Sequence, residues 1–163
     1  FDAARCVRCR TCEMACKSAH DLEPGVRWRW IADEWRGEYP LVTRTVFSLA
    51  CMHCAAPACA DACPTGAISK RSEDGVVVVD AALCDGCREC APACPFGVPQ
   101  FGADGLMQKC DYCLGLGREP ACTRSCPTDA LSFGPLAELR ARAEGRRVKP
   151  HDEAVGPSIV IVL

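Results

Sequence analysis

The clearest apolar and polar pattern along this chain is that of short β-strands. The stretch Val42–Ala50 alternates between the two kinds of side chain and is rich in β-forming residues, which predicts a strand. Two shorter apolar stretches, Ala67–Lys70 and Val76–Asp80, flank the polar residues Ser72–Gly75. Because polar residues that end on glycine favour turns, we expect these two stretches to form a β-hairpin.

The C-terminal part of the chain has a different pattern. Residues 135–145 begin with Pro135, are rich in helix formers and end on Gly145, which predicts one amphipathic helix. The closing sequence GPSIVIVL favours an extended strand that pairs with another sheet, either in this chain or on a partner. Its apolar run is far too short to span a bilayer, and we expect no transmembrane segment in this chain.

The composition adds an unusual number of cysteines. Sixteen of the 163 residues are Cys, whereas aromatic residues make up only 6%. Short chains with so few large side chains build a modest core and depend on disulfides or bound metal. The cysteines form four groups: Cys6, Cys9, Cys12 and Cys16; Cys51, Cys54, Cys59 and Cys63; Cys84, Cys87, Cys90 and Cys94; and Cys110, Cys113, Cys122 and Cys126.

The spacing within these groups distinguishes three chemistries. Disulfides do not explain a middle cysteine two residues from each neighbour, because cysteines that close rarely pair without strain. Structural zinc explains each Cys-x-x-Cys pair but not the third and fourth sulfur of a group. Iron–sulfur clusters use the run Cys-x2-Cys-x2-Cys-x3-Cys-Pro, which the third group matches through Pro95. We therefore predict [4Fe–4S] clusters, with zinc as the alternative.

Bound clusters would also change the charge of the protein. The formal net charge is −2, counted with neutral thiols. Sixteen thiolates and four oxidised cluster cores bring the charge to roughly −10. Because the scattered Arg and Lys residues then offset an acidic interior, we expect no nucleic-acid partner.

An internal repeat organises the four groups. The sequence FDAARCVRCRTCEMAC at residues 1–16 aligns without gaps with VDAALCDGCRECAPAC at residues 79–94, at an offset of 78. In the same way, CPTGAI at residues 63–68 parallels CPTDAL at residues 126–131. The chain therefore contains two kinds of cysteine group, each present twice in alternation.

The order of groups predicts two ferredoxin-like modules, one within the other. Residues 51–99 have the layout of a bacterial two-cluster ferredoxin, in which the fourth Cys of each motif binds the other cluster. Residues 1–50 plus 100–134 would then form an outer module with permuted ends, in which DALSFG pairs near FDAAR. The residues also allow a sequential alternative, in which the first group pairs with the second. The predicted fold class is α+β, with two nested 2[4Fe–4S] ferredoxin-like modules and a tail at 135–163.

The insertion 17–50 in the outer module holds most of the remaining aromatic residues. Trp28, Trp30, Trp35 and Tyr39 lie within a short stretch that also contains several arginines. They either fill a small satellite core over the outer clusters or form a docking surface, since Trp and Arg are favoured at interface hot spots.

The cysteine groups and their surroundings resemble a known family. FDAARCVRCRTCEMACK, CMHCAAPACADACPTGAI, VVVDAALCDGCRECAPACPFGVPQF, KCDYCLGLGREPACTRSCP and ALSFGPLAELR are together similar to the four-cluster iron–sulfur subunit of dimethyl sulfoxide reductase-type molybdopterin oxidoreductases. Nitrate reductase-type subunits replace one cysteine of the third group by Trp, whereas all four are present here, which implies four [4Fe–4S] clusters. Formate dehydrogenase-type subunits carry a C-terminal transmembrane helix, which we do not expect here. Polysulfide, arsenate and related reductases use similar subunits, so these residues specify no substrate.

The resemblance also implies which cysteines share a cluster, in agreement with the nested arrangement. It places the first cluster nearest the catalytic subunit and the fourth at the far end. The implied ligands are Cys6, Cys9, Cys12 and Cys126 for cluster 1; Cys16, Cys110, Cys113 and Cys122 for cluster 2; Cys51, Cys54, Cys59 and Cys94 for cluster 3; and Cys63, Cys84, Cys87 and Cys90 for cluster 4.

The expected function is electron transfer without catalysis. The three histidines, His20, His53 and His151, form no recognisable nucleophile–base arrangement, and His53 is expected to tune or shield a cluster. The expected partners are a large molybdopterin-containing catalytic subunit of an anaerobic reductase, which the tail at 135–163 would contact, and a separate membrane anchor subunit or a soluble electron carrier. The protein would be membrane-associated through these partners, exported with the catalytic subunit, or cytoplasmic. The alternatives are a free-standing polyferredoxin and a zinc-dependent structural or nucleic-acid module.

Overall fold

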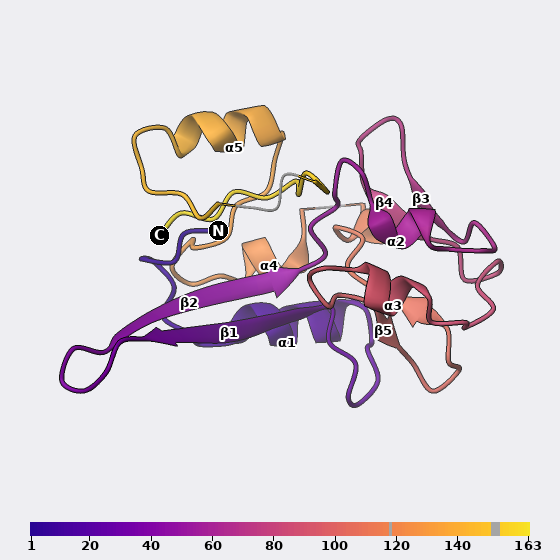
Figure 1. Ribbon diagram of the computed structural model, residues 1–163, viewed down its shortest axis with the longest axis horizontal. Helices are drawn as coiled ribbons and strands as arrows, with labels where there is room; N and C mark the ends of the chain where they lie inside the picture. Colours follow the sequence, from indigo (N-terminus) through magenta and orange to yellow (C-terminus); the bar gives the residue numbers. More distant parts are fainter. Residues whose placement is uncertain (118, 151–153) are drawn as a thin grey trace.

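Short helices and two-stranded antiparallel sheets make up the regular structure of the chain (Figure 1). The computed structural model describes residues 1–117, 119–150 and 154–163. This mixture of helices and strands agrees with the predicted α+β class. The elements are α1 (Thr11–Ala19), β1 (Arg29–Arg36), β2 (Thr43–Ala50), α2 (Ala58–Asp61), β3 (Ile68–Lys70), β4 (Val77–Val79), α3 (Cys90–Ala93), β5 (Gln100–Phe101), β6 (Met107–Gln108), the 3-10 helix η1 (Leu114–Leu116), α4 (Ala121–Arg124) and α5 (Leu136–Arg142).

The hairpin expected between the second and third cysteine groups is present as β3 and β4. These strands pair antiparallel, with Ile68 opposite Val79. Their turn is closed by a hydrogen bond from the Val76 backbone N–H to the Asp74 carboxylate at 3.0 Å. Gly75 takes a φ of 71°, a left-handed conformation that costs glycine little. The glycine that the sequence predicted at the end of this turn therefore allows the turn to close.

The longest sheet is the β1–β2 hairpin, which extends away from the rest of the molecule (Figure 1). The predicted strand at 42–50 is confirmed as β2, but its partner β1 was not predicted. The charged residues of β1 interrupt the alternation of apolar and polar side chains that would mark a strand in the sequence. In the folded protein, Asp33 of this strand pairs with charged residues outside it. Asp33 accepts hydrogen bonds from Arg44 of β2 at 2.8 Å and from Arg8 at 2.7 Å.

Helix α1 packs against β1 and α4 and carries two cysteines of the first group. Cys12 and Cys16 lie one turn apart on the same face, and both are buried. Glu13 fixes the helix to the sheet, since its Oε1 accepts a hydrogen bond from the Ile31 backbone N–H at 2.6 Å. The helix therefore holds the two thiols against the inner side of the β1–β2 hairpin.

The core consists of two small clusters, and cysteines belong to both. One cluster contains Cys12, Ile31, Val46 and Cys122. The other contains Ile68, Val77, Cys90 and Met107. Because each cluster is small and includes cysteine, the interior depends on what those cysteines bind as well as on apolar packing.

The tail returns to the start of the chain, so the two termini lie close together (Figure 1). The expected helix forms as α5 and ends earlier than expected. The closing apolar run pairs within this chain: Val162 N donates to Phe1 O and Val162 O accepts from Ala3 N, both at 2.8 Å. Asp2 N donates to Ala130 O at 2.8 Å, so FDAAR meets the predicted DALSFG segment through one backbone hydrogen bond rather than a regular strand.

No helix within the described ranges combines the length and the apolar character needed to cross a membrane.

Candidate iron–sulfur cluster sites

The second and third cysteine groups surround two cavities. In each cavity, three cysteines come from one group and the fourth comes from the other. Met107 lies between the two cavities and lines both. The first cavity is lined by Cys51, Cys54, Cys59 and Cys94, and the second by Cys63, Cys84, Cys87 and Cys90.

Two short helices produce this exchange of cysteines. Cys59 and Cys63 lie four residues apart around α2, and Cys90 and Cys94 are related in the same way around α3. The two helices pack on each other and on residues of the β3–β4 hairpin. Each helix therefore gives one thiol to the cavity on its own side and one to the neighbouring cavity.

The loops that carry the cysteines repeat their backbone conformation as well as their sequence. Arg8 and Gly86, which are 78 residues apart, have φ values of 60° and 72°. Arg10 and Arg88 correspond in the same way, with φ values of 60° and 68°. Residues other than glycine rarely adopt this left-handed region, and it is typical of functional loops. The first and third groups are therefore built alike.

The second and fourth groups share a second local conformation. His53 and Tyr112 each precede the second cysteine of their group, with φ values of 43° and 57°. Their rings also stack on each other, with centroids 3.9 Å apart. The two equivalent loops thus contact each other through these rings, whose planes are tilted by 33°.

The first and fourth cysteine groups also lie together. Cys12 and Cys122 share one apolar cluster, against which Cys6 packs. Burial, together with the neighbouring thiols of the fourth group, raises the pKa of Cys16 to about 12. Hydrogen bonds from Thr11 lower the pKa of Cys9, and the nearby charge of Cys126 opposes them.

These positions can be compared with the implied ligand sets. The two cavities coincide with the sets implied for clusters 3 and 4. Cysteines of the first group adjoin those of the fourth, as the sets for clusters 1 and 2 require. The assignment of each cysteine to a particular iron stays a prediction.

Burial makes several of the cysteine thiols harder to ionise. Burial raises the pKa of Cys110 to about 12 and that of Cys59 to about 11. A buried thiolate without a positive partner is unfavourable, so these side chains need a cation such as iron to ionise. In this respect the buried donor set fits a metal cluster.

The last cysteine of the second and fourth groups has hydrogen-bond donors around its sulfur. Although burial opposes it, hydrogen bonds from Thr128 and Ala130 lower the pKa of Cys126. The Ala130 backbone nitrogen lies 3.3 Å from Cys126 Sγ, and the Thr128 hydroxyl lies 3.8 Å from it. Cys63 repeats this contact with the Thr65 hydroxyl at 3.6 Å. Such donors stabilise a thiolate ligand and influence cluster potential.

The four cysteines of each inner cavity surround an open space and do not converge on a single position. In the described part of the chain, no three Cys, His or carboxylate side chains converge closely enough to hold a single metal ion. The walls of the first cavity are mostly apolar, with Val77, Phe96 and Val98 among them. A cube-shaped cluster with one ligand at each iron corner fits such an arrangement.

His20 and His53 lie beside cysteine groups. His53 is 1% exposed, and its Nδ1 accepts a hydrogen bond from Val77 N at 3.0 Å. Burial, together with the charges of Lys109 and Lys70, lowers the pKa of His53 to about 2, so the ring is neutral. His20 Nε2 lies 3.2 Å from Cys113 Sγ, a contact that spacing could not reveal. His151 lies outside the described residues.

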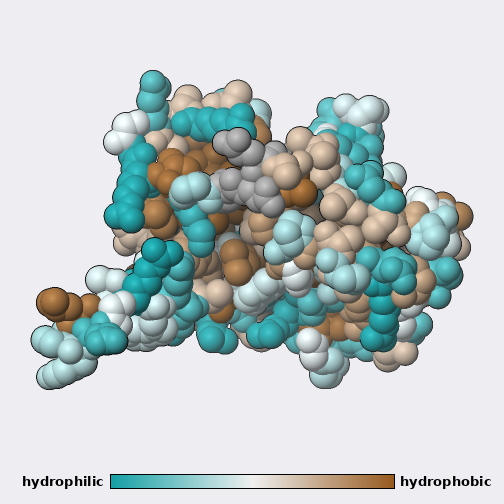
Figure 2. Space-filling model, viewed as in Figure 1, coloured by the Kyte–Doolittle hydropathy of each residue, from teal (hydrophilic) through white to brown (hydrophobic). Residues whose placement is uncertain are grey.

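The sequence of the tryptophan-rich insertion allowed either packed or exposed aromatic side chains, and the insertion contains both. Trp28 packs inward: its Nε1 donates to Gln108 at 3.0 Å and its ring lies 4.4 Å from that of His20. Trp35 and Tyr39 instead belong to the β1–β2 hairpin and are 61% and 93% exposed. Figure 2 shows apolar atoms at the tip of this hairpin, where Leu41 is also exposed.

Two cationic residues near the cysteines were missed by sequence reasoning. Lys109 is only 4% exposed and lines the first inner cavity, where its Nζ donates to the backbone oxygens of Val77 and Cys110. Arg29 lies near cysteines of the first and fourth groups. Burial lowers the pKa of its guanidinium, whereas the nearby thiols raise it. Lys109 could have been found from its place next to Cys110, whereas Arg29 is far in sequence from every cysteine.

Comparison with known proteins is consistent with these sites. Residues 42–136 match the family model described as 4Fe-4S dicluster domain, and residues 3–19 match that described as 4Fe-4S binding domain. The sequence is 46% identical over 154 residues to the probable anaerobic dimethyl sulfoxide reductase subunit YnfG of Escherichia coli K12, an alignment that covers 87% of this protein and 75% of that one. The B subunit of anaerobic dimethyl sulfoxide reductase from the same strain is also 46% identical, with the same coverage. Protein NrfC of that strain is 39% identical over 83% of this protein and 63% of its own length.

Proposed function

Because the protein is a member of the family of iron–sulfur electron-transfer subunits of the dimethyl sulfoxide reductase type, we propose that it carries electrons through four [4Fe–4S] clusters to or from a molybdopterin-containing catalytic subunit. The protein is a non-catalytic subunit. The observation that carries the proposal is the pair of inner cavities, each lined by four cysteines that two sequence groups share. Sixteen cysteines allow four such sets.

The proposed ligand sets follow from this sharing. Clusters 3 and 4 would occupy the two inner cavities, held by the quartets that line them. Clusters 1 and 2 would be held between the first and fourth groups, with Cys126 completing the set of Cys6, Cys9 and Cys12. The contact of Cys12 with Cys122 and the influence of Cys126 on Cys9 support this assignment.

The same contacts support a nested arrangement of two modules. The inner module would comprise residues 51–99, and the outer one residues 1–50 and 100–134. Equivalent left-handed residues in the repeated loops support this relation, as does the hydrogen bond from Asp2 N to Ala130 O. In this arrangement the inner module is inserted into the outer one. The two halves of the outer module then come from opposite ends of the chain and lie next to each other.

The proposed electron path runs through the four sets in order. When bound, the clusters supply sites that gain and lose single electrons. The residues of the protein hold neighbouring sets close together: Cys12 adjoins Cys122, and Cys51 is among the charges that raise the pKa of Cys110. Met107 borders both inner cavities.

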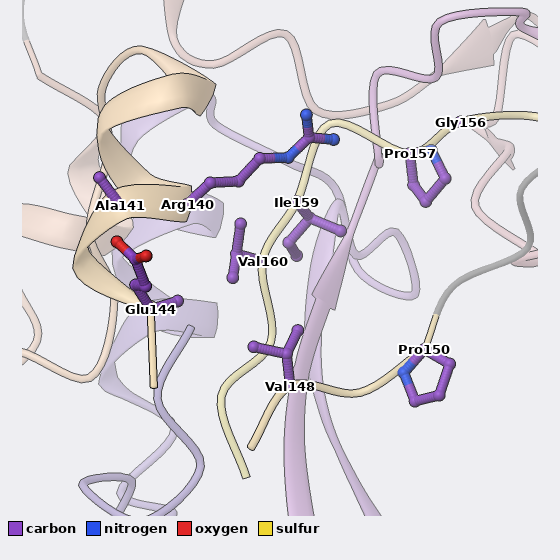
Figure 3. Close-up of a pocket in the computed structure, with 10 residues that line it drawn as sticks. Arg140, Ala141, Glu144, Val148, Pro150, Gly156, Pro157, Ile159 and Val160 are labelled. Carbon is purple, nitrogen blue, oxygen red and sulfur yellow. The ribbon is translucent and has the colours of Figure 1, made fainter. Parts of the chain in front are cut away.

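The tail is the proposed contact with the catalytic subunit. None of the residues of α5 is buried, although Leu136 and Leu139 are apolar. Figure 3 shows a pocket between this helix, with Arg140 and Ala141, the turn that follows it, with Glu144, and the returning segment, with Val148 and Val160. A partner that covers this face would bury apolar surface that this protein alone leaves open.

The remaining partners follow from the need to exchange electrons at the far end. We expect either a separate membrane anchor subunit or a soluble electron carrier there. The protein would then be associated with a membrane through its partners, exported with the catalytic subunit, or cytoplasmic.

Anaerobic purification of the tagged protein from cells that express its complex tests this proposal. We expect a large subunit that contains molybdenum and pterin to co-elute in a 1:1 ratio. Elution of the protein alone with a full iron content would favour a free-standing polyferredoxin carrier instead. Elution with zinc in place of iron would support the zinc alternative.

A further inference from the structure

His20 lies at the end of helix α1, beside a cysteine of the fourth group. Its backbone N–H donates to Cys16 O at 3.2 Å, which caps the helix. Its side chain is 12% exposed, and its ring centroid lies 4.4 Å from that of Trp28. Trp28 is held in turn by its hydrogen bond to Gln108 at 3.0 Å. The imidazole is therefore fixed by the end of the helix and by a packed aromatic ring.

The Nε2 atom of His20 faces two hydrogen-bond acceptors. Cys113 Sγ lies 3.2 Å from it, and Asp111 Oδ1 lies 3.8 Å from it. Asp111 Oδ1 accepts a hydrogen bond from Cys113 N at 2.8 Å as well. A cysteine that binds iron has lost its proton, so its sulfur can only accept a hydrogen bond. The hydrogen of the contact with Cys113 therefore belongs to Nε2, which carries one both in a neutral tautomer and in the imidazolium.

The internal repeat shows that this donor belongs to the outer module alone. When the offset of 78 residues is continued beyond Cys16, His20 corresponds to Val98. Cys113 corresponds to Cys54, since each is the second cysteine of its group. Val98 is 2% exposed and lines the same cavity as Cys54. The inner site thus has an apolar side chain where the outer site has an imidazole.

We propose that His20 donates a hydrogen bond to the Cys113 sulfur and thereby raises the reduction potential of the cluster that Cys113 binds. This inference rests on the four-cluster function proposed above, with Cys113 as a ligand. Reduction brings one electron from a neighbouring cluster and increases the negative charge on the sulfur ligands, which strengthens a hydrogen bond that they accept. No proton is transferred in this step, because Nε2 keeps its hydrogen. The donor therefore stabilises the reduced form more than the oxidised form.

Redox titration of the purified complex, followed by electron paramagnetic resonance, tests the proposal. His20→Phe keeps an aromatic ring beside Trp28 and removes the donor. In this variant we expect the ratio of reduced to oxidised cluster to fall at least fivefold at a given ambient potential, a shift of about 40 mV for one electron, since tenfold equals about 59 mV. The signal is identified as the one that changes in Cys113→Ser. The cluster proposed for Cys54 should keep its midpoint potential.

A second variant separates the hydrogen bond from the ring and from any charge. His20→Gln supplies a neutral amide N–H near the position of Nε2, so the ratio should stay within twofold of that of the unsubstituted protein. A shift in His20→Gln as large as that in His20→Phe would contradict a role for the hydrogen bond.

Isotopic labelling of the histidine nitrogens gives a readout that a purely structural role would not move. Electron nuclear double resonance at the signal of the Cys113 cluster should detect a labelled nitrogen in the unsubstituted complex. The same coupling should be lost in His20→Gln, whose donor nitrogen is not labelled.

Iron content, measured for each variant, decides how the titrations are interpreted. With full iron, an unchanged ratio in His20→Phe, or an equal shift of all clusters, would overturn the proposal. If His20→Phe loses iron, the labelled complex decides: a nitrogen coupling that disappears in His20→Gln supports the proposal, and an unsubstituted complex without this coupling contradicts it. An unsubstituted complex with fewer than four clusters would refute the proposed function itself, whatever the variants do.

Discussion

Cys63 and Cys126 occupy equivalent places in the two halves of the repeat. Each is followed by proline and threonine, and each sulfur lies within 3.8 Å of that threonine hydroxyl. Each is also the cysteine proposed to leave its own group and complete another. Cys63 and Cys126 are therefore two of the four proposed remote ligands, together with Cys16 and Cys94.

Exchange of these cysteines for serine gives a paired prediction. Cys126→Ser should alter the cluster of Cys6, Cys9 and Cys12, whereas Cys63→Ser should alter that of Cys84, Cys87 and Cys90. Serine binds iron less favourably than a thiolate, so the affected cluster shifts its potential or loses one iron. Electron paramagnetic resonance of the two variants distinguishes the clusters. If Cys126→Ser instead changed the cluster of Cys84, Cys87 and Cys90, the nested ligand assignment would be wrong.

Residues that influence the sites without binding iron were harder to anticipate. The cysteine groups were evident because their ligands must follow one another at fixed spacing. Arg29 and His20 approach the cysteines only through folding: Arg29 reaches them across a hairpin, and His20 contacts Cys113 from 93 positions away. Spacing along the sequence contains no information on such contacts.

Among the elements, the hairpin of β3 and β4 and the strand β2 were predicted, because β-forming side chains and a turn signal mark them. Strand β1 was missed, since its charges are satisfied by Arg44 and Arg8 only after the sheet forms. The closing apolar run was expected to pair with some sheet. It pairs with the first residues of the same protein, which are far away in sequence.

Helix α5 provides the prediction at this scale. Ala141 is exposed and borders the pocket in Figure 3, so Ala141→Arg should obstruct a partner that docks there. We expect the affinity for the catalytic subunit to fall at least tenfold with iron content unchanged, as measured by titration of the separated subunits. The matched control is Ala82→Arg, which is also at an exposed site but outside this pocket, and which should retain full affinity. Equal affinities for both variants would exclude α5 from the interface.

At the scale of the whole molecule, the internal repeat of the sequence explains more of the fold than the packing of apolar side chains does. The offset of 78 residues predicted two similar groups, and the matching φ values of Arg8 with Gly86 and Arg10 with Arg88 show that the likeness extends to the backbone. The return of the tail to Phe1 could not be predicted in this way, because it has no counterpart in the inner module. Small apolar clusters that include cysteine complete the interior.

The most direct test of the central claim is the iron and sulfide content of the anaerobically purified protein, together with its zinc content. Four cubane clusters require about sixteen iron and sixteen sulfide per protein molecule, which is the result we predict. Eight or fewer iron atoms per molecule, accompanied by stoichiometric zinc, would contradict the account.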